Sequence, residues 1–347
     1  MRKAIIALLI VAIAFVPVAA LFAEGQAEEG EDAGDAQRHA FIFKNTGNPY
    51  GEKQMDGFRV GIEEQGYDAI LRAPDQPTAE AQIQIIEQLV AQRVQSIAIT
   101  GNDFDALEPA LSRAMDQGIT VASADSAVNP DSRMVHVNQA DAEMIGRTLI
   151  QAAYDMADGA GDIAILSATS QASNQNLWIE WMNTELEENA EKYASLNLVR
   201  VAYGDDLRDK SVSETEGLLQ SFPDLEVIIA PTTVGIAAAS RVITDRGLIG
   251  EVKVTGLGLP SEMAEYIENG ACPYMYLWNP IDVGYLTAYT VTALNEGTIT
   301  GAAGEVFQAG DLGEFQIVEA SDGGTEILLG APFEFNPENI DEWKDVY

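Results

Sequence analysis

We predict an α/β protein built as two Rossmann-like lobes with parallel sheets, joined by a hinge. Short apolar or β-branched runs alternate with longer segments of helical period from residue 39 to about 296. The short runs are apolar throughout, which is typical of parallel strands covered on both faces. The alternation also continues too long for one ordinary open sheet, and it is interrupted twice in the same manner.

The predicted strands share this unbroken hydrophobicity. They are AFIFK (40–44), QSIAIT (95–100), ITVAS (119–123), DIAILS (162–167), NLVRVAY (197–203), EVIIAP (226–231) and VKVTGL (252–257). Between them, TAEAQIQIIEQLVAQ places Ile83, Ile86 and Val90 on one helical stripe, and FDALEPALSRAMDQG ends at Gly118, a natural helix stop. Alternation of this kind indicates βαβ units with right-handed crossovers.

Two interruptions favour two lobes over the alternative, a (β/α)8 barrel. In MVHVNQADAEMIG (134–146), a strand runs through Asn138 into a helix without a turn glycine. YLWNPIDVGYL (276–286) has the same form, with Asn279 and Pro280 between strand and helix. We therefore expect an N-terminal lobe of residues 39–138 plus 281–307, and a C-terminal lobe of residues 139–280 plus 308–347.

The N-terminus resembles an export signal. Met1-Arg2-Lys3 precedes twenty apolar residues, 4–23, that end in small side chains, which predicts a cleavable signal peptide over residues 1–23. The alternative is a retained membrane anchor, because the run is long enough to span a bilayer. Residues 24–38 are acidic and rich in Gly and Ala, which predicts a disordered linker. We expect the folded part to work in the periplasm.

Charge and composition exclude several classes of function. The chain has 347 residues with 55 acidic and 19 basic side chains, a net charge of −36, which argues against nucleic acid or an anionic membrane surface as a partner. One cysteine, Cys272, allows no intramolecular disulfide and no cysteine-based metal cluster. Two histidines leave little for histidine chemistry. We expect no metal and no cofactor.

Polar side chains gather where the predicted strands end, the edge at which open parallel sheets bind ligands. They are Lys44 and Asn45; Asn102 and Asp103; Asp125; Asn174 and Gln175; Tyr203, Asp205 and Asp206; Pro231, Thr232 and Thr233; and Asn279, with the aromatic residues Tyr50, Trp178 and Trp278 nearby. Carboxylates and amides paired with aromatic faces suit a neutral polyol. Each residue also has a structural reading: Asn48-Pro49 can begin a helix, and Asp103 can cap the helix near Ala106.

Enzyme motifs are missing from the sequence. It contains no Walker A loop, no HExxH and no G-x-S-x-G. GLGLPS (256–261) matches only half of a dinucleotide fingerprint. Asp103 and Asp125 could be imagined as an acid–base pair, but nothing in the sequence supplies a nucleophile for them to act with. We therefore expect a binding protein rather than an enzyme.

The strand-end motifs resemble the periplasmic sugar-binding proteins of ABC importers, in the type I, ribose-binding-like branch. KNTGNPYGEKQMDGF (44–58) is similar to that family's first-strand loop, Asp125 stands at its sugar-binding aspartate, and Asn279 at its polar hinge residue. Within the branch, residues 165–182, 228–242, 255–263 and 277–286 resemble rhamnose-binding proteins. The resemblance implies L-rhamnose as ligand.

Autoinducer-2 receptors are the next most similar group, sharing the positions of Lys44 and Asp125. They have Asp-Gln where this chain has Asn174-Gln175, and Pro-Asp-Ala where it has Pro231-Thr232-Thr233. By resemblance, Lys44, Asp125, Asn174, Gln175, Pro231 and Thr233 line the site, joined by Tyr50, Asn102, Asn138, Trp278 and Asn279.

The resemblance implies capture without turnover: sugar bridges the lobes, the hinge closes, and the membrane subunits of an importer recognise the closed monomer. A sensory receptor of the same fold is compatible with the same residues, and a secreted carbohydrate enzyme is a third class. A repressor of this fold is excluded by the signal peptide and by the lack of an N-terminal helix-turn-helix.

Overall fold

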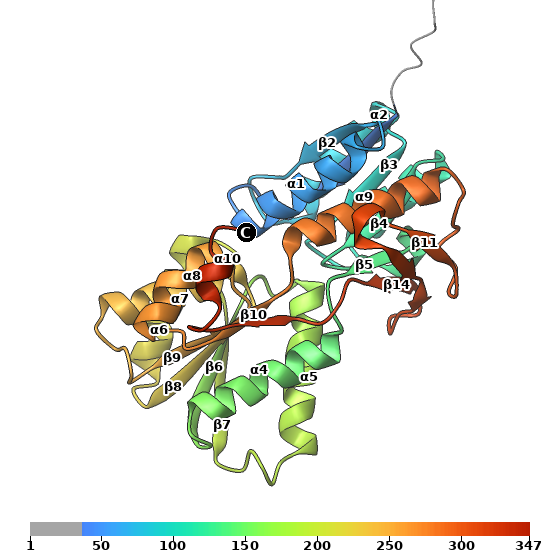
Figure 1. The fold of residues 1–347 in the computed structure, drawn as a ribbon. Helices are drawn as coiled ribbons and strands as arrows, with labels where there is room; N and C mark the ends of the chain where they lie inside the picture. Colours follow the sequence, from blue (N-terminus) through green and yellow to red (C-terminus); the bar gives the residue numbers. More distant parts are fainter. Residues whose placement is uncertain (1–36) are drawn as a thin grey trace, which may run out of the picture. The chain divides into compact units, whose positions relative to one another are not determined.

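The computed structural model describes residues 37–347, so the predicted signal peptide and nearly all of the acidic linker lie outside the described residues. Among residues 37–347, no helix is both long and apolar enough to cross a membrane. The described residues form two lobes, each built around one main sheet (Figure 1). The predicted α/β architecture with parallel sheets is confirmed, and the two separate open sheets are not those of a (β/α)8 barrel.

The first lobe contains a seven-stranded sheet in the order β13-β14-β5-β4-β3-β1-β2, with every neighbouring pair parallel except β13 and β14. The strands are β1 (Arg38–Ile42), β2 (Asp68–Arg72), β3 (Ser96–Ile99), β4 (Thr120–Ala124), β5 (His136–Asn138), β13 (Val318–Glu319) and β14 (Thr325–Leu328). Its helices are α1 (Pro49–Glu63), α2 (Ala79–Ala91), α3 (Glu108–Asp116) and α9 (Pro280–Asn295).

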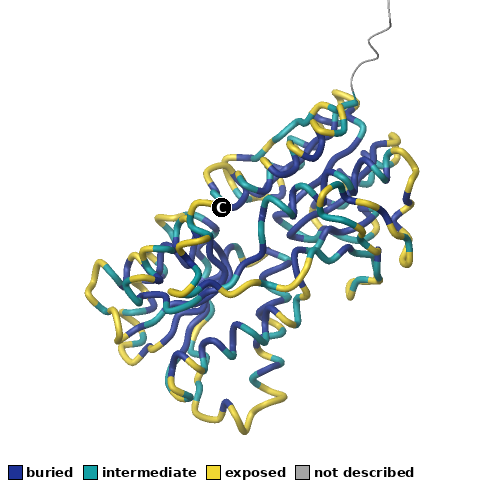
Figure 2. The backbone as a smooth tube through the Cα atoms, viewed as in Figure 1, coloured by how far each residue is buried: buried dark blue, intermediate teal, exposed yellow. Residues whose placement is uncertain are grey.

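Successive residues of β1 point to opposite faces of this sheet and fill different halves of the core. Phe41 packs with α1 and α9 through Phe58 and Leu286, whereas Ile42 belongs to the half beneath α2 and α3. Because both faces are covered, the strand is buried from His39 onward, as its unbroken hydrophobicity predicts. Figure 2 shows the buried strands as dark blue between helices whose outer surfaces are exposed.

The second lobe contains a parallel four-stranded sheet in the order β7-β6-β8-β9. Its strands are β6 (Gly161–Ser167), β7 (Leu196–Tyr203), β8 (Leu225–Ala230) and β9 (Lys253–Gly256). Its helices are α4 (Ala142–Met156), α5 (Ser173–Glu188), α6 (Arg208–Ser221), α7 (Thr233–Asp245), α8 (Pro260–Asn269) and α10 (Ile340–Trp343). Helix α4 packs on α5, α6 on α7, and α8 on α10.

Four further short strands and two 3-10 turns complete the described residues. β10 (Met275–Leu277) pairs antiparallel with β15 (Phe333–Phe335), and β11 (Val306–Gln308) pairs antiparallel with β12 (Glu314–Gln316). The 3-10 turns are Pro130–Ser132 and Gly310–Leu312.

Within residues 37–347 the chain passes between the lobes three times. The first two passages follow Asn138 and precede Pro280, at the two interruptions seen in the sequence. The third lies between β14 and β15, at residues 329–332. This differs from the boundary expected at residue 308, because β14 pairs with β5 and so lies in the first sheet. β13 and β14 have two and four residues, too few for either to stand out as a strand in the sequence.

The backbones of α1 and α9 are in close contact, and this contact positions the N-terminal ends of both helices. A Cβ on Gly57 would lie 2.0 Å from Ile281 O, and one on Gly284 would lie 1.9 Å from Gln54 O. Only glycine therefore fits at this crossing. The contact fixes the starts of both helices, which carry Tyr50 in α1 and the Trp278-Asn279 pair just before α9.

Candidate ligand-binding site

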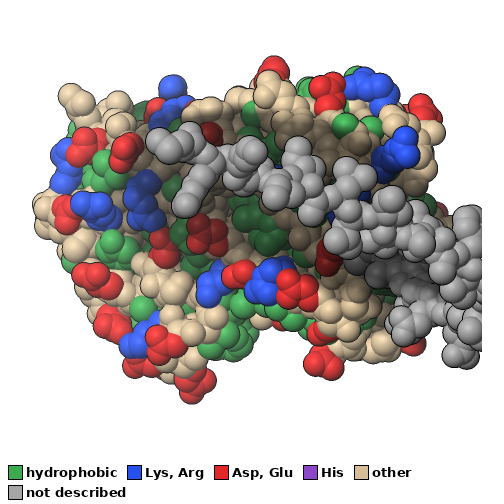
Figure 3. Space-filling view, turned by 90° about the horizontal axis from the view of Figure 1, so that it is seen from above, with side chains coloured by type: hydrophobic (Ala, Val, Ile, Leu, Met, Phe, Trp, Pro, Cys, Tyr) green, Lys and Arg blue, Asp and Glu red, His purple; other side chains and the backbone are tan. Residues whose placement is uncertain are grey.

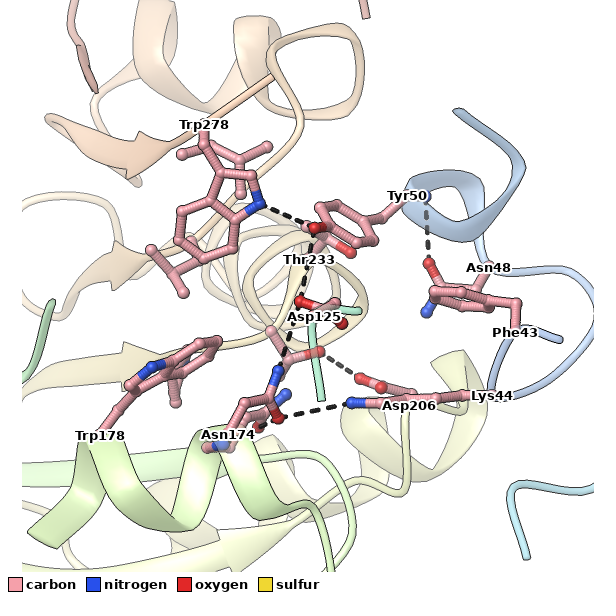
Figure 4. A pocket seen from close by; sticks show the side chains of 15 residues that line it. Phe43, Lys44, Asn48, Tyr50, Asp125, Asn174, Trp178, Asp206, Thr233 and Trp278 are labelled. Carbon is pink, nitrogen blue, oxygen red and sulfur yellow. Dashed lines mark hydrogen bonds between the residues drawn. The ribbon is translucent and has the colours of Figure 1, made fainter. Parts of the chain in front are cut away.

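A cavity of about 40 Å³ lies between the strand ends of the two lobes and is lined by residues of both. Its lining consists of Phe43, Lys44, Asn48, Tyr50, Asp125, Asn174, Gln175, Trp178, Asp206, Pro231, Thr232, Thr233, Leu257, Leu277 and Trp278. In Figure 4, Tyr50, Asp125 and Asn174 point toward one another, with Trp178 and Trp278 on one side and Lys44 and Asp206 on the other. We call this space the central cavity.

Three aromatic side chains form one wall of the central cavity. Trp278 Nε1 donates to Tyr50 Oη at 2.7 Å, and the two rings meet edge to face at a centroid distance of 6.5 Å. Trp178, on α5 of the second lobe, meets Trp278 at 5.9 Å. All three are buried, so the wall combines apolar ring faces with a hydroxyl that already has a donor.

Asp125 is the central acceptor of the cavity. It follows β4 with a left-handed backbone, φ 63°, a conformation that aspartate tolerates better than most residues. Its Oδ1 accepts from Tyr50 Oη and from Asn174 Nδ2, each at 3.4 Å. Burial raises the pKa of this carboxyl to about 6, although Lys44 opposes the shift.

Lys44 and Asn174 connect the two lobes across the cavity. Lys44 Nζ donates to Asn174 Oδ1 at 3.5 Å, so the Asn174 amide bridges the lysine and Asp125. The lysine backbone is held from below, because Asn102 Nδ2 donates to Lys44 O at 2.8 Å.

Gln175 anchors the start of α5 to the end of β6. Its Oε1 accepts from Ser167 Oγ at 2.7 Å and from Ala168 N at 2.8 Å. Its own backbone N–H donates to Asn174 Oδ1 at 2.8 Å. The pair Asn174-Gln175 is therefore fixed in orientation at the cavity wall.

Asp206 supplies a second carboxylate to the central cavity, and it was not among the predicted ligand-binding residues. It lies just beyond β7 with φ 53°, is buried, and accepts a hydrogen bond from Thr232 Oγ1. Burial raises the pKa of Asp206, and Lys44 acts against that shift. The sequence signal was the Asp205-Asp206 pair at the end of a predicted strand.

Five residues of the predicted set do not line the central cavity. Asn45 donates to Thr46 O at 3.3 Å, Asn102 supports Lys44, and Asp103 Oδ1 accepts from Asp105 N and Ala106 N at 3.0 and 2.8 Å. Asn138 donates to Glu326 at 2.8 Å, and Asn279 caps α9 by accepting from Ile281 N at 3.0 Å. Asp103 therefore accepts from backbone amides of its own turn, which is the structural role predicted from the sequence as the alternative to ligand binding.

Four other lining residues were missed as site residues. Asn48 is the N-cap of α1, accepting from Tyr50 N at 3.1 Å, and it also faces the cavity. Phe43, Leu257 and Leu277 end or follow strands, where their hydrophobicity reads as core. No sequence signal separates such a residue from one buried in the core.

The arrangement suits a small neutral ligand with several hydroxyl groups. Two carboxylates and one ammonium group leave the lining with a formal charge close to −1, which disfavours an anion. Carboxylates accept from hydroxyls, while lysine and amide groups donate to them. Among residues 37–347, no cluster of three or more His, Cys, Asp or Glu side chains could hold a metal ion.

Comparison with known proteins gives a consistent result. The periplasmic binding protein domain family matches residues 39–299. An ABC transporter solute binding protein from Clostridium phytofermentas, solved with bound L-rhamnose, is 50% identical, with a TM-score of 0.88 over 90% of this chain and 99% of that one.

Two more distant proteins are also similar, one in structure and one in sequence. LsrB from Clostridium saccharobutylicum, solved in complex with AI-2, is 22% identical with a TM-score of 0.82, covering 88% of this chain and 99% of that one. The D-ribose/D-allose-binding protein of Pseudomonas aeruginosa is 23% identical over 254 residues, 70% of this chain and 74% of that protein.

Proposed function

This chain belongs to the periplasmic binding protein family, as a sugar-binding protein of an ABC transporter, and from that premise we propose that it captures L-rhamnose and delivers it to the importer's membrane subunits. The observation that carries the proposal is the central cavity, where both lobes contribute polar side chains and aromatic residues. The 50% identity to a protein solved with bound L-rhamnose supports this choice of sugar.

The chemistry of the cavity suits a deoxy sugar. Asp125 and Asp206 would accept from ring hydroxyls, and Lys44 would donate to a hydroxyl oxygen. Trp178 and Trp278 offer an apolar surface for the methyl group that rhamnose carries in place of one hydroxyl. A hydroxyl in the wrong position would leave one of these buried groups unpaired, at a cost of about 1–3 kcal/mol.

Binding would couple to closure of the lobes. The cavity of about 40 Å³ has room for about three water molecules at 10–15 Å³ each, so a sugar needs the lobes to part or the lining to rearrange. The contacts of Asn174 with Lys44 and Asp125 are those that a ligand would replace with its own hydroxyls. Contacts to both lobes give the ligand a higher affinity for the closed form.

Export by a cleaved signal peptide, action in the periplasm as a monomer, and hinge points near residues 138 and 280 belong to the same proposal. A receptor for autoinducer-2 or another sugar, of the same fold, is the alternative. The likeness to LsrB concerns the fold alone.

A thermal-shift panel tests the ligand. Purified chain would be heated with L-rhamnose, other monosaccharides and autoinducer-2, followed by calorimetry of each compound that raises Tm. We expect L-rhamnose to give the largest rise, since a ligand at 100 times its Kd adds about 2.7 kcal/mol to the free energy of unfolding. A larger rise with autoinducer-2 would establish the receptor instead, and no rise with any sugar would reject the proposal.

A further inference from the structure

A second space, which we call the side groove, opens beside the central cavity. Its volume is about 610 Å³, and the first and second lobes both contribute to its lining. It shares Asp125, Asn174 and Trp178 with the central cavity, so the two spaces meet at these three side chains. The side groove remains open while the lobes contact one another, because the Lys44–Asn174 and Asn174–Asp125 contacts are already made.

An aromatic residue in a fixed position forms one side of the groove. Trp181 lies one helical turn beyond Trp178 on α5, and both line the groove. A Cβ on Gly146 of α4 would lie 2.5 Å from Trp181 Cβ, so α4 packs directly behind it. The guanidinium of Arg147 lies 5.3 Å from the centre of the Trp181 ring. The ring is therefore held in place before any ligand arrives, and only part of it is buried.

Buried polar groups with free hydrogen-bonding capacity also face this space. Asp125 uses only Oδ1 in its hydrogen bonds, and Oδ2 makes none with residues 37–347. His136, 5% exposed, lines the groove, and its Nδ1 shares a hydrogen bond of 2.8 Å with Ser123 Oγ. Within the described residues no hydrogen bond engages His136 Nε2. Burial lowers the pKa of His136 well below its usual range, with Arg133 acting in the same direction, so the ring is neutral at pH 7.

The charges around the groove disfavour an anionic occupant. Among its carboxylates, Asp141 accepts from Met144 N at 2.7 Å, Glu143 pairs with Arg147 at 2.8 Å, and Asp322 pairs with Arg133 at 2.6 Å. Glu180 and Glu326 add further negative charge, and no lysine or arginine is among the described lining residues. An anion would meet repulsion here, whereas a second sugar ring would find an aromatic face and acceptors.

We propose that the side groove is a subsite for a neutral substituent on the anomeric oxygen of the bound sugar, so that the protein takes glycosides and short saccharides as well as the free monosaccharide. A substituent leaving the central cavity past Asp125, Asn174 and Trp178 enters the groove once the bound sugar has replaced the Asn174–Asp125 contact. A second sugar ring would then stack on Trp181. This proposal rests on the proposed function, because it places the first sugar in the central cavity.

Calorimetry on the purified chain would compare four probes: L-rhamnose, methyl rhamnoside, rutinose (a disaccharide that carries rhamnose on glucose) and the anomeric phosphate of rhamnose. We expect methyl rhamnoside and rutinose to bind within about tenfold of L-rhamnose, and the phosphate to bind at least tenfold more weakly than methyl rhamnoside. If L-rhamnose binds and neither glycoside does, the subsite is rejected while the proposed function stands. If L-rhamnose does not bind either, both proposals fail. A phosphate that binds as well as methyl rhamnoside would reject the assignment of a neutral occupant.

Trp181→Leu locates the substituent, with Trp343→Leu as the matched control. Trp343 packs in α10 among Phe333, Phe335 and Tyr347 and does not line the groove. Trp181→Leu should weaken rutinose about fivefold or more and leave L-rhamnose within about twofold, which also shows that the variant is folded. Trp343→Leu should change neither affinity. Equal rutinose affinity in wild type and Trp181→Leu would place the second ring elsewhere and overturn the assignment.

Discussion

Asp125 combines three properties that are individually uncommon in one side chain. Its backbone is left-handed, the residue is 5% exposed, and its carboxylate accepts hydrogen bonds from both lobes, from Tyr50 and Asn174. The unfavourable backbone and the loss of hydration both cost free energy in the empty protein. Such costs are typical of functional positions, which supports a role for this carboxylate in ligand binding.

Replacing Asp125 by alanine should lower the affinity for L-rhamnose at least about tenfold, because bound hydroxyls lose a charged acceptor. Asp103→Ala is the matched control, since Asp103 accepts only from turn amides outside the cavity. Calorimetry would measure both affinities, and Tm would show that each variant is folded. Unchanged affinity in Asp125→Ala would remove this residue from the site.

Ligand affinity should depend on pH because burial raises the pKa of Asp125 to about 6. The folded protein takes up this proton more readily than the unfolded chain, whose carboxyl titrates at about 4, so Asp125 contributes less to the free energy of unfolding as pH rises from about 4 to about 6. For binding, the acceptor is lost below pH 6, and L-rhamnose affinity should fall about tenfold between pH 7.5 and 5.

Asp125→Asn is the control for the pH effect, because its amide does not titrate in this range. Calorimetry across the same pH values should give a weaker but much flatter profile for this variant. An identical pH dependence in both proteins would assign the effect to another group.

At the residue scale, the sequence predicted the polar part of the site better than the apolar part. Lys44 and Asp125 were predicted from their place after a parallel strand, at the edge where open sheets bind ligands, and both line the central cavity. Asp103 follows a strand as well, but its side chain turns back to cap its own loop. Periodicity cannot distinguish those two outcomes, nor can it tell that the core residue Phe43 also lines a cavity.

At the scale of elements, helices α1 and α9 of the first lobe pack with their backbones in direct contact. Gly57 and Gly284 allow the two backbones to touch, at positions where a Cβ would lie within 2.0 Å of a carbonyl oxygen. Since α1 carries Tyr50 and α9 follows Trp278, this crossing sets the distance between those two rings. The packing of two glycines thus determines the geometry of the aromatic wall.

Gly284→Ala should lower the free energy of unfolding by about 3 kcal/mol, because its Cβ would meet Gln54 O at 1.9 Å and the helices would have to separate. The matched control is Gly217→Ala in α6, where nothing lies within 4 Å of the added Cβ. The control should stabilise the protein by up to about 1 kcal/mol, since alanine favours helix more than glycine does. Urea unfolding measures both, and equal effects of the two substitutions would contradict this account.

Among the elements, the fully buried parallel strands were predictable, whereas the edge strand β2 and the late short strands were not. A strand covered on both faces must be apolar along its whole length, as in β3 and β8, and such runs stand out in a sequence. β2 is a partly exposed edge strand, and β11 to β15 have at most four residues each. Such short or partly exposed runs lack the unbroken hydrophobicity that marks a buried strand, and β14 and β15 also pair with β5 and β10, which lie far away in the chain.

On the scale of the whole molecule, the excess negative charge is the dominant electrostatic feature. The chain carries a net charge of −36 at pH 7. Lysine and arginine side chains lie among acidic ones on the face seen in Figure 3, but they are too few to balance them. Exposed charges of one sign repel one another in the compact state more than in the unfolded chain.

Added salt should therefore stabilise the protein. At 0.5 M NaCl the screening length falls to roughly 4–5 Å, below most distances between surface charges, and Tm should rise by a few degrees relative to low salt. Tm would be measured by calorimetry in NaCl and in sucrose of equal osmolarity. The comparison distinguishes screening of surface charges from exclusion of the solute from the protein surface. A Tm that falls with NaCl would show that attractive ion pairs outweigh the repulsion.

The first lobe is discontinuous in the chain, since its sheet takes β14 and its covering layer takes α9 from beyond residue 279. In the sheet, β14 lies between β5 and the edge strand β13, and it belongs to about the last thirty residues of the sequence. A ribosome that has released only the first half of this polypeptide has therefore not yet supplied the segments needed to finish either lobe. The nascent chain therefore cannot complete its fold until translation is nearly over.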